Sequence, residues 1–259
     1  MNSIKIVGHW KNIEKTYIKI AGHWKEAVNI LLRENGKWVN TDHLSPSMNL
    51  TLTVSDVAKV GEVQLKAANN NVTRTVSGKK VNFKSLVYET IQIVIGTADI
   101  ESIEGFVEAG HRLFGDWKTT TRTPVLTHFD TSITMNMYGM FTHMEKVTTQ
   151  LNLVNFDTSK VTNMSRMFSG VRGFDFNTGY GIENFNIESL TDANLMFGNT
   201  RSVKTALYDA ILTKWSAQNF KHDVRLGMGT AKYSNTSAII ACRKKLTDAG
   251  WVISDGGHT

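Results

Sequence analysis

The sequence predicts an α+β protein in which a β-rich N-terminal region precedes a short repeat solenoid that ends in a helical unit. Three observations support this prediction. Tryptophan recurs every 14 residues near the start of the 259-residue chain, phenylalanine recurs every 27 to 29 residues from Phe114 onward, and two stretches near the end have apolar residues at helical spacing. A constant period of about 20 to 50 residues is typical of stacked supersecondary units that share a core.

The first 45 residues contain a repeat centred on Gly-x-Trp. Isoleucine alternates with lysine before each of the first two glycines, which predicts a short strand, a tight turn at glycine and a return strand led by tryptophan. We expect the tryptophans to pack between hairpins, with ligand stacking as the alternative. The units are IKIVGHWK (4–11), IKIAGHWK (18–25) and LRENGKWV (32–39), and their tryptophans are Trp10, Trp24 and Trp38.

These units resemble the short Gly-x-Trp hairpin repeats of virion proteins from tailed bacteriophages, particularly tail and fibre components. The resemblance covers residues 4–39. It implies that residues 1–45 attach the protein to a virion.

Residues 46–98 are expected to form a β-rich connector. Alternating apolar and β-branched residues predict five strands, separated by turn signals such as Ser77-Gly78. The only segment with helical character is SDVAKV at 55–60, and no chemistry is visible here. The predicted strands are NLTLTV (49–54), EVQLKA (62–67), VTRTV (72–76), KKVNF (79–83) and IQIVIG (91–96).

The solenoid is expected to occupy residues 99–259 and to form a body separable from residues 1–98. In the copy at 151–168, LNLVNF predicts a strand, Asp157 or Ser159 a cap, and the following segment a short helical turn whose apolar residues face inward. Those residues are Val161, Met164, Met167 and Phe168. The four copies, FVEAGHRLF, ITMNMYGMF, KVTNMSRMF and SLTDANLMF, end at the structural repeat positions Phe114, Phe141, Phe168 and Phe197.

The segment FDTSKVTNMSRMFSG resembles the repeat of the BspA-like leucine-rich-repeat family, and residues 208–257 resemble the terminal unit of that family. The resemblance implies a leucine-rich-repeat solenoid with a terminal capping unit from residue 205. The first copy lacks the FDTS turn, as expected of an N-terminal capping unit. Members of the family occur among bacterial surface proteins, mycoplasma lipoproteins, protist surface antigens and some phage proteins.

The residue spacing of the terminal unit predicts two helices and a strand, independently of any family resemblance. Leu207, Ile211 and Trp215 recur at helical spacing, and a second helix is expected in SAIIACRKKLTDAG, with Ser237 as its N-cap and Gly250 beyond its end. WVISDGG then predicts a short strand. This unit would cover the open end of the solenoid.

The sequence contains none of the common catalytic motifs, and we expect no catalytic residue, no metal and no cofactor. Asp130 and Asp157 occupy equivalent repeat positions, so repeated caps explain them better than a general acid/base pair. Residues 175–179 faintly resemble the start of a calcium loop, but an insertion loop is the better interpretation. The single cysteine, Cys242, excludes an intramolecular disulfide and is expected to be buried and unreactive.

Charge and targeting signals limit the function. The net charge of +6 is concentrated at the two ends, whereas residues 101–200 hold seven cations and eleven carboxylates, which argues against a nucleic-acid groove. No signal peptide or membrane-length apolar run is visible, so we expect synthesis in a host cytoplasm and no membrane insertion.

The sequence thus favours a non-enzymatic structural or binding protein of a tailed-phage virion, expected to be a homo-oligomer. Other virion proteins would contact its N-terminal region, and a host surface protein or glycan would contact its repeats. The alternative is a bacterial cell-surface BspA-like adhesin. A third class is a cryptic glycan-active enzyme.

Overall fold

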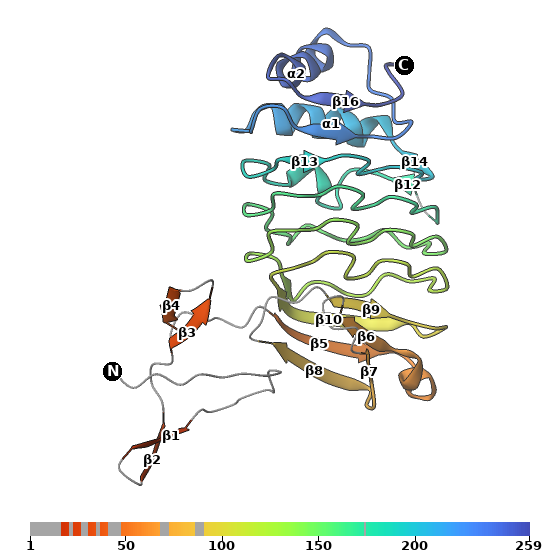
Figure 1. The fold of residues 1–259 in the computed structure, drawn as a ribbon. Coiled ribbons are helices and arrows are strands. Elements are labelled where there is room, and N and C mark those ends of the chain that lie inside the picture. Colours follow the sequence, from red (N-terminus) through yellow and green to blue (C-terminus); the bar gives the residue numbers. More distant parts are fainter. Residues whose placement is uncertain are drawn as a thin grey trace.

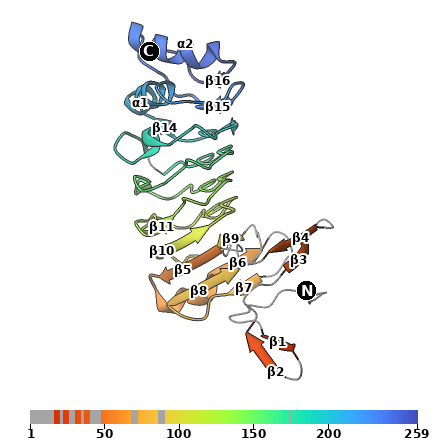
Figure 2. The ribbon, with the colours of Figure 1, turned by 90° about the vertical axis from the view of Figure 1, so that its left-hand side faces the viewer.

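The computed structural model describes residues 17–20, 23–26, 31–34, 37–40, 48–67, 73–85, 91–173 and 175–259. From residue 48 onward these residues form mixed sheets with few helices, an α+β arrangement without a closed barrel. Figure 1 shows a β-rich layer at one end, a tall stack of coils, and a helical unit at the other end. Figure 2 shows the same stack from its side.

Two of the three predicted N-terminal hairpins are present. β1 (Tyr17–Ile20) pairs antiparallel with β2 (His23–Glu26), and β3 (Leu31–Glu34) pairs antiparallel with β4 (Lys37–Asn40). Trp24 lies in β2 opposite Lys19, and Trp38 lies in β4 opposite Arg33. The first unit, with Trp10, lies outside the described residues, and so does the expected packing of the three tryptophan side chains.

The connector contributes strands to two small sheets, which confirms its β-rich character, and one of these sheets continues past residue 98. One sheet has the order β11-β10-β5-β8 and the other β7-β6-β9. The weak helix expected at residues 55–60 is present as the 3-10 helix η2, which begins two residues later and is capped by Asp56. The strands are β5 (Met48–Val54), β6 (Gln64–Ala67), β7 (Thr73–Thr75), β8 (Lys80–Ser85), β9 (Ile91–Val94), β10 (Ile100–Val107) and β11 (Phe129–Asp130), and η2 spans Val57–Glu62.

The expected boundary at residues 98/99 crosses a continuous sheet. β10 pairs antiparallel with β5 from Ile100 opposite Val54 to Val107 opposite Met48. Across the same boundary, Trp117 Nε1 donates a hydrogen bond to the Ile93 carbonyl at 2.7 Å, and buried residues on both sides join one core cluster. Whether residues 99–259 fold alone therefore stays a prediction.

The middle of the chain is a stack of coils joined by a parallel ladder. Parallel bridges connect Ala109 to Asn136, Asn136 to Asn163, and Asn163 to Asp192, so each coil lies directly above the equivalent part of the one before. The N–H group of every repeat phenylalanine donates to a carbonyl of the next coil at 2.9 Å. Short elements occur where coils touch: β12 (Asp175–Phe176), β13 (Asp192–Ala193), β14 (Ser202–Val203) and the 3-10 helix η3 (Ile182–Asn184).

The predicted strand at 151–156 and the predicted helical turn at 161–168 are wrong. Both segments are turns and irregular backbone, apart from the bridge at Asn163. Arg166 has a φ of 57°, and a left-handed residue stops a right-handed helix. The amide groups instead donate to neighbouring coils, as when Leu153 N donates to the Tyr180 carbonyl at 2.7 Å. Coil-to-coil bonding therefore replaces both local elements.

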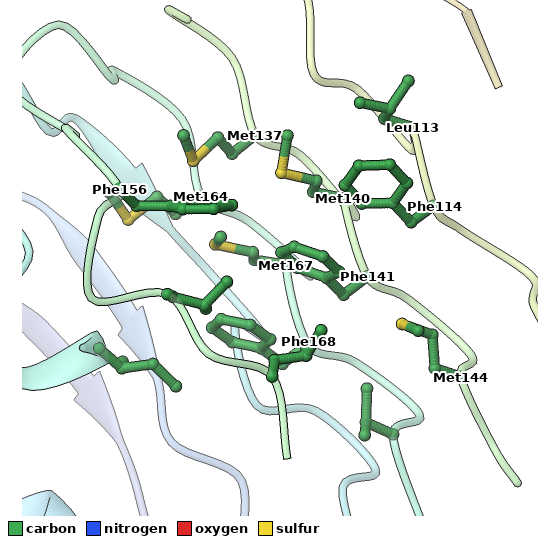
Figure 3. Close-up of a cluster of buried hydrophobic side chains, with 14 of the residues drawn as sticks. Leu113, Phe114, Met137, Met140, Phe141, Met144, Phe156, Met164, Met167 and Phe168 are labelled. Carbon is green, nitrogen blue, oxygen red and sulfur yellow. The ribbon is translucent and has the colours of Figure 1, made fainter. Parts of the chain in front are cut away.

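The interior of the stack follows the predicted register. Val161, Met164, Met167 and Phe168 have no exposed surface, which confirms that they face inward. Phe114, Phe141, Phe168 and Phe197 form a column whose successive ring centroids lie 5.2, 5.8 and 5.2 Å apart. Figure 3 shows the first three of these rings with methionines from successive coils beside them. Burial of each large apolar side chain contributes about 1.5–3 kcal/mol.

The C-terminal unit contains both predicted helices and the predicted strand. In α1 (Thr205–Ser216), Leu207, Ile211 and Trp215 are fully buried. β16 (Val252–Ser254) pairs parallel with β15 (Arg225–Gly227), which pairs with β13. Gly250, with a φ of 83°, follows α2 (Ser237–Asp248) as predicted.

Two details of α2 correct the sequence interpretation. Thr236, rather than Ser237, is the N-cap, because its extended backbone lets its side chain accept a hydrogen bond from Ile239 N at 3.4 Å. Cys242 is half-buried rather than buried, because α2 covers the end of the stack and keeps one side in solvent.

A buried polar network ties the C-terminal segment to both helices. The Tyr208 hydroxyl donates to Asp255 Oδ2 at 2.5 Å, and Arg243 Nε donates to the same oxygen at 3.0 Å. Burial, followed by the hydrogen bond to Asp255, raises the pKa of Tyr208 far above its ordinary value. Tyr208 therefore acts as a neutral donor that holds the terminal strand in place.

Candidate functional site

The repeat separates residues that build the stack from residues on its outside. In each coil the repeat phenylalanine, the residue before it and the residue four before it are buried. The residues three before, two before and two after the phenylalanine are at least partly exposed in most coils, and we call this set of positions the ladder face; Gly139, Ser165 and Gly170 are its buried members. It comprises His111, Tyr138, Ser165 and Asn194; Arg112, Gly139, Arg166 and Leu195; and Asp116, His143, Gly170 and Asn199.

A shared backbone conformation positions these outer residues. The residues two before and two after each phenylalanine all have positive φ, between 53° and 74°. This conformation costs roughly 1–2 kcal/mol for a residue other than glycine, so each coil retains it only because inter-coil hydrogen bonds fix the backbone. The ladder face is therefore rigid at the backbone, and its character depends on the side chains.

Asp116 is the centre of a polar cluster on the ladder face. It forms an ion pair with Arg112, and its Oδ1 lies 2.9 Å from His143 Nδ1. Gln92 Nε2 donates to Asp116 Oδ2 at 3.3 Å and to the Gly115 carbonyl at 2.9 Å. The side chains of Arg112, Asp116 and His143 are 38%, 34% and 44% exposed, so the cluster is held in place yet open to a ligand.

Two pKa shifts follow from this geometry. Partial burial acts to raise the pKa of Asp116, but hydrogen bonds from His143 and Arg112 outweigh it and leave the pKa below its usual value. Partial burial, with the nearby charge of Arg112, lowers the pKa of His111. At neutral pH the cluster therefore presents a carboxylate beside a guanidinium, with a neutral imidazole at His111.

Glycines in neighbouring coils make room for the large polar side chains. A Cβ at Gly139 would lie 3.2 Å from Arg112 Cγ, and a Cβ at Gly170 would overlap the His143 ring. Both glycines have positive φ, 57° and 74°. Arg112 and His143 can therefore lie along the stack instead of projecting from it.

An aromatic pair lies beside the cluster. The rings of His111 and Tyr138 stack with centroids 4.7 Å apart and an angle of 15° between their planes. At the equivalent position one coil further on, Ser165 is buried, and its hydroxyl has no hydrogen-bond partner among the described residues. A buried hydroxyl without a partner costs about 1–3 kcal/mol, so this row is not optimised for stability alone.

The chemistry available on the ladder face consists of hydrogen bonds, ion pairs and ring contacts. It offers charged and neutral hydrogen-bonding groups next to an aromatic ring. Within the described residues, no hydroxyl or thiol is hydrogen-bonded to His143, and no group of three His, Cys, Asp or Glu side chains could hold a metal ion. The same part of the chain contains no helix with the length and apolarity to cross a bilayer.

The predicted site residues lie elsewhere. Phe114, Phe141, Phe168 and Phe197 are in the interior, with no exposed surface. The side chains of Asp130 and Asp157 accept hydrogen bonds from the backbone N–H two residues on, at 2.8 and 2.9 Å, so they stabilise turns rather than helix ends. The N–H of Gly179, in the segment weighed as a calcium loop, donates to Glu183 Oε1 at 2.8 Å.

The ladder face is not predicted from the sequence, because the predictions rest on the residues that the four repeat copies have in common. The positions at which the copies differ are visible in the same alignment. His111, Tyr138, Ser165 and Asn194 occupy one repeat position yet differ in chemistry, whereas the buried positions stay apolar or small. Variation at outward positions of a conserved framework is therefore the pattern that would have found this site.

Comparison with protein families gives a match over residues 108–237, which cover half of the chain, to the family described as "Mycoplasma protein of unknown function, DUF285". The chain belongs to this family, which is related to the BspA-like repeat proteins. No curated protein and no solved structure matches the chain.

Proposed function

We propose that this protein is a non-enzymatic binding protein. Its coil stack is a short leucine-rich-repeat solenoid of the BspA-like type, and its ladder face contacts a protein or glycan. One observation carries the proposal: interior positions repeat from coil to coil, whereas outward positions hold a cluster that occurs once. Repetition is sufficient for stability in a stack of this kind, so the unrepeated cluster calls for another explanation.

The geometry of the cluster supports binding. Arg112, Asp116 and His143 hold one another in a fixed arrangement before any ligand arrives, which reduces the entropy lost on association. The Tyr138 ring offers a flat apolar surface with a polar tip, a combination enriched at protein interfaces.

Paired alanine variants test the ladder face. Tyr138→Ala with His143→Ala should abolish most binding of the labelled full-length chain to a glycan array and to intact host cells. His128→Ala with Tyr180→Ala removes the same two side-chain types from exposed positions off this face and should leave binding unchanged. Equal loss of binding in both variants, with both still folded, would contradict the proposal.

We further propose that the N-terminal region, residues 1–45, attaches the protein to a tailed-phage virion. The Gly-x-Trp units support this, as does the excess of cations in residues 1–40, seven Lys/Arg against three Glu. An isolated two-stranded hairpin is only marginally stable in water, so hairpins such as β1–β2 gain from a partner, which also favours a homo-oligomer.

Deletion of residues 1–40 tests attachment. The shortened chain should fold and stay soluble, yet be missing from purified particles when their proteins are identified by mass spectrometry. Incorporation at normal levels would place attachment elsewhere in the chain.

The alternative function is that of a bacterial cell-surface adhesin. The description of the matching family, a mycoplasma protein of unknown function, favours this alternative. Protease treatment of intact cells that carry the gene separates the two. Removal of the protein from cells that release no particles would favour the adhesin, and recovery of the protein in purified particles would favour the virion.

A further inference from the structure

One edge of the coil stack collects positive charge. At this edge the turn segments 118–123, 145–150, 172–176 (without residue 174) and 201–204 lie one above another. Thr148 N donates to the Thr121 carbonyl at 3.0 Å, Gln150 Nε2 donates to the Asp175 carbonyl at 2.5 Å, and β12 pairs parallel with β14. In Figure 1, β12 and β14 lie at the right-hand side of the stack. We call these four segments the basic edge.

The four segments of the basic edge contain six cations and two carboxylates, and a third carboxylate, that of Asp99, accepts a hydrogen bond from Thr120. Asp175 is engaged by Lys204 at 2.7 Å and by Arg201 at 3.7 Å. Among the described residues, no carboxylate lies within ion-pair distance of the other four cations, all of them exposed, and Glu145 is also without a cationic partner. The four cations are Lys118, Arg122, Lys146 and Arg172.

This concentration runs against the composition of the repeats. Residues 101–200 contain more carboxylates than cations, eleven against seven, yet four of the seven cations lie on this edge. The turns that contain Asp130, Asp157 and Glu188 contain one cation, Lys160. Carboxylates therefore outnumber cations in those turns, whereas cations outnumber carboxylates on the basic edge.

The four unpaired cations do not lie directly opposite one another. Lys118, Glu145 and Arg172 occupy equivalent positions of successive coils, so a carboxylate lies between two cations in this row. Lys146 and Arg122 are equivalent to threonines of the neighbouring coil. The edge nevertheless holds more cations than carboxylates, and a bound polyanion would neutralise the excess.

We propose that the basic edge binds a linear anionic glycopolymer, whose phosphate or carboxylate groups follow the row of cations along the stack. Between the cations, Thr121, Thr148 and Thr149 are exposed. The Thr148 hydroxyl donates to the Thr121 carbonyl at 3.2 Å and the Thr149 hydroxyl accepts from Thr123 N at 2.9 Å, so these contacts fix polar side chains beside the cations. The described residues of the edge expose no aromatic ring, which a single-stranded nucleic acid would use for base stacking. The site is separate from the ladder face and does not depend on the function proposed for it.

The test measures binding of the full-length chain to poly(glycerol phosphate), polygalacturonate, neutral dextran and duplex DNA. We expect one or both anionic glycopolymers to bind and dextran not to bind. Tighter binding of poly(glycerol phosphate) would identify phosphate as the preferred group, and tighter binding of polygalacturonate would identify carboxylate. With about 0.7 counterions released per contact, four contacts predict that affinity falls roughly fiftyfold between about 50 and about 200 mM salt. Equal or tighter binding of DNA would overturn the proposal.

A charge-matched pair of variants locates the site. The edge variant should lose binding and its salt dependence and should change the melting temperature little, because all four side chains are exposed. It combines Lys118→Gln, Arg122→Gln, Lys146→Gln and Arg172→Gln. The control variant neutralises four exposed cations elsewhere: Lys160, Lys221, Arg225 and Lys232, each replaced by Gln. It should bind as the wild type does. Unchanged binding by the edge variant, or equal loss in the control, would overturn the proposal.

Discussion

The interior of the coil stack and its ladder face are formed by different positions of the same repeats, and they differ in how their residues vary from coil to coil. Inside, phenylalanine follows phenylalanine and methionine follows methionine from coil to coil, and the column of rings is continuous. Outside, the position that holds His111 in one coil holds Tyr138 in the next. A backbone fixed by its core leaves outer side chains free to vary, which lets one framework present different binding surfaces.

Substitutions in the two regions should also affect the stability of the protein differently. An interior substitution affects the contacts between coils and therefore the stability of the whole stack. A ladder-face substitution affects a few half-exposed groups whose interactions are screened by water. Stability measurements can therefore separate the two regions.

Truncation should have the largest effect. The sequence predicts that residues 99–259 fold alone, but the structure leads us to expect the opposite. Removal of β5 exposes the edge of β10 and takes away four buried side chains, Met48, Leu50, Leu52 and Val54, each contributing about 1.5–3 kcal/mol. That sum is comparable with the ~5–15 kcal/mol stability of a typical domain.

Denaturant unfolding of two fragments checks this expectation. Residues 46–259 retain the sheet and should unfold cooperatively, whereas residues 99–259 should show no cooperative transition. A sharp transition in the shorter fragment at the denaturant midpoint of the longer one would show that the coils need no support from β5.

Phe168→Ala should have the next largest effect. The ring has no exposed surface and contacts the rings of Phe141 and Phe197, so its removal leaves a cavity in the column. We expect a loss of roughly 3–5 kcal/mol in the free energy of unfolding. Val154→Ala, at a side chain that is 51% exposed, is the control and should change stability by less than about 0.5 kcal/mol. Similar losses in both variants would mean that the interior and surface are wrongly assigned.

The sequence predicted the parts of the fold that depend on periodicity. The inward register of Met164 and Phe168, the strands of the connector, and the two C-terminal helices all follow from spacing. It failed inside each coil, where spacing suggested a strand and a helical turn but hydrogen bonds to the next coil decide the backbone. Asp116 and His143 occupy one repeat position in adjacent coils and could be grouped from the alignment, whereas Gln92 lies outside the repeats, so its contact with Asp116 could not be predicted.

Gly170→Ala tests the link between the coil backbone and the ladder face. A Cβ at this left-handed residue would overlap the His143 ring, whereas Gly179, also left-handed, has no atom within 4 Å of such a Cβ. Gly179→Ala should therefore cost only the backbone strain, about 1–2 kcal/mol, and Gly170→Ala should cost roughly 1–3 kcal/mol more.

A double variant isolates the overlap. His143→Ala should recover the additional loss of Gly170→Ala but should not rescue Gly179→Ala. If Gly170→Ala and His143→Ala have additive effects on the free energy of unfolding, the two residues do not compete for space.

The smallest effect should come from the ion pairs of Asp116. Its pKa in the folded protein lies below that of an exposed aspartate, about 3.9, so its stabilising contribution is present above that pH and is lost as the pH falls through the folded value. Because the carboxylate is a third exposed, screening limits the contribution to about 0–1 kcal/mol. Asp116→Asn should lower the melting temperature slightly at neutral pH, and the difference from wild type should vanish at acidic pH and shrink in about 1 M salt. A difference in melting temperature that stayed constant with pH and salt would contradict this expectation. It would mean that the charge of Asp116 contributes nothing measurable to stability and that the side chain acts through its shape and hydrogen bonds.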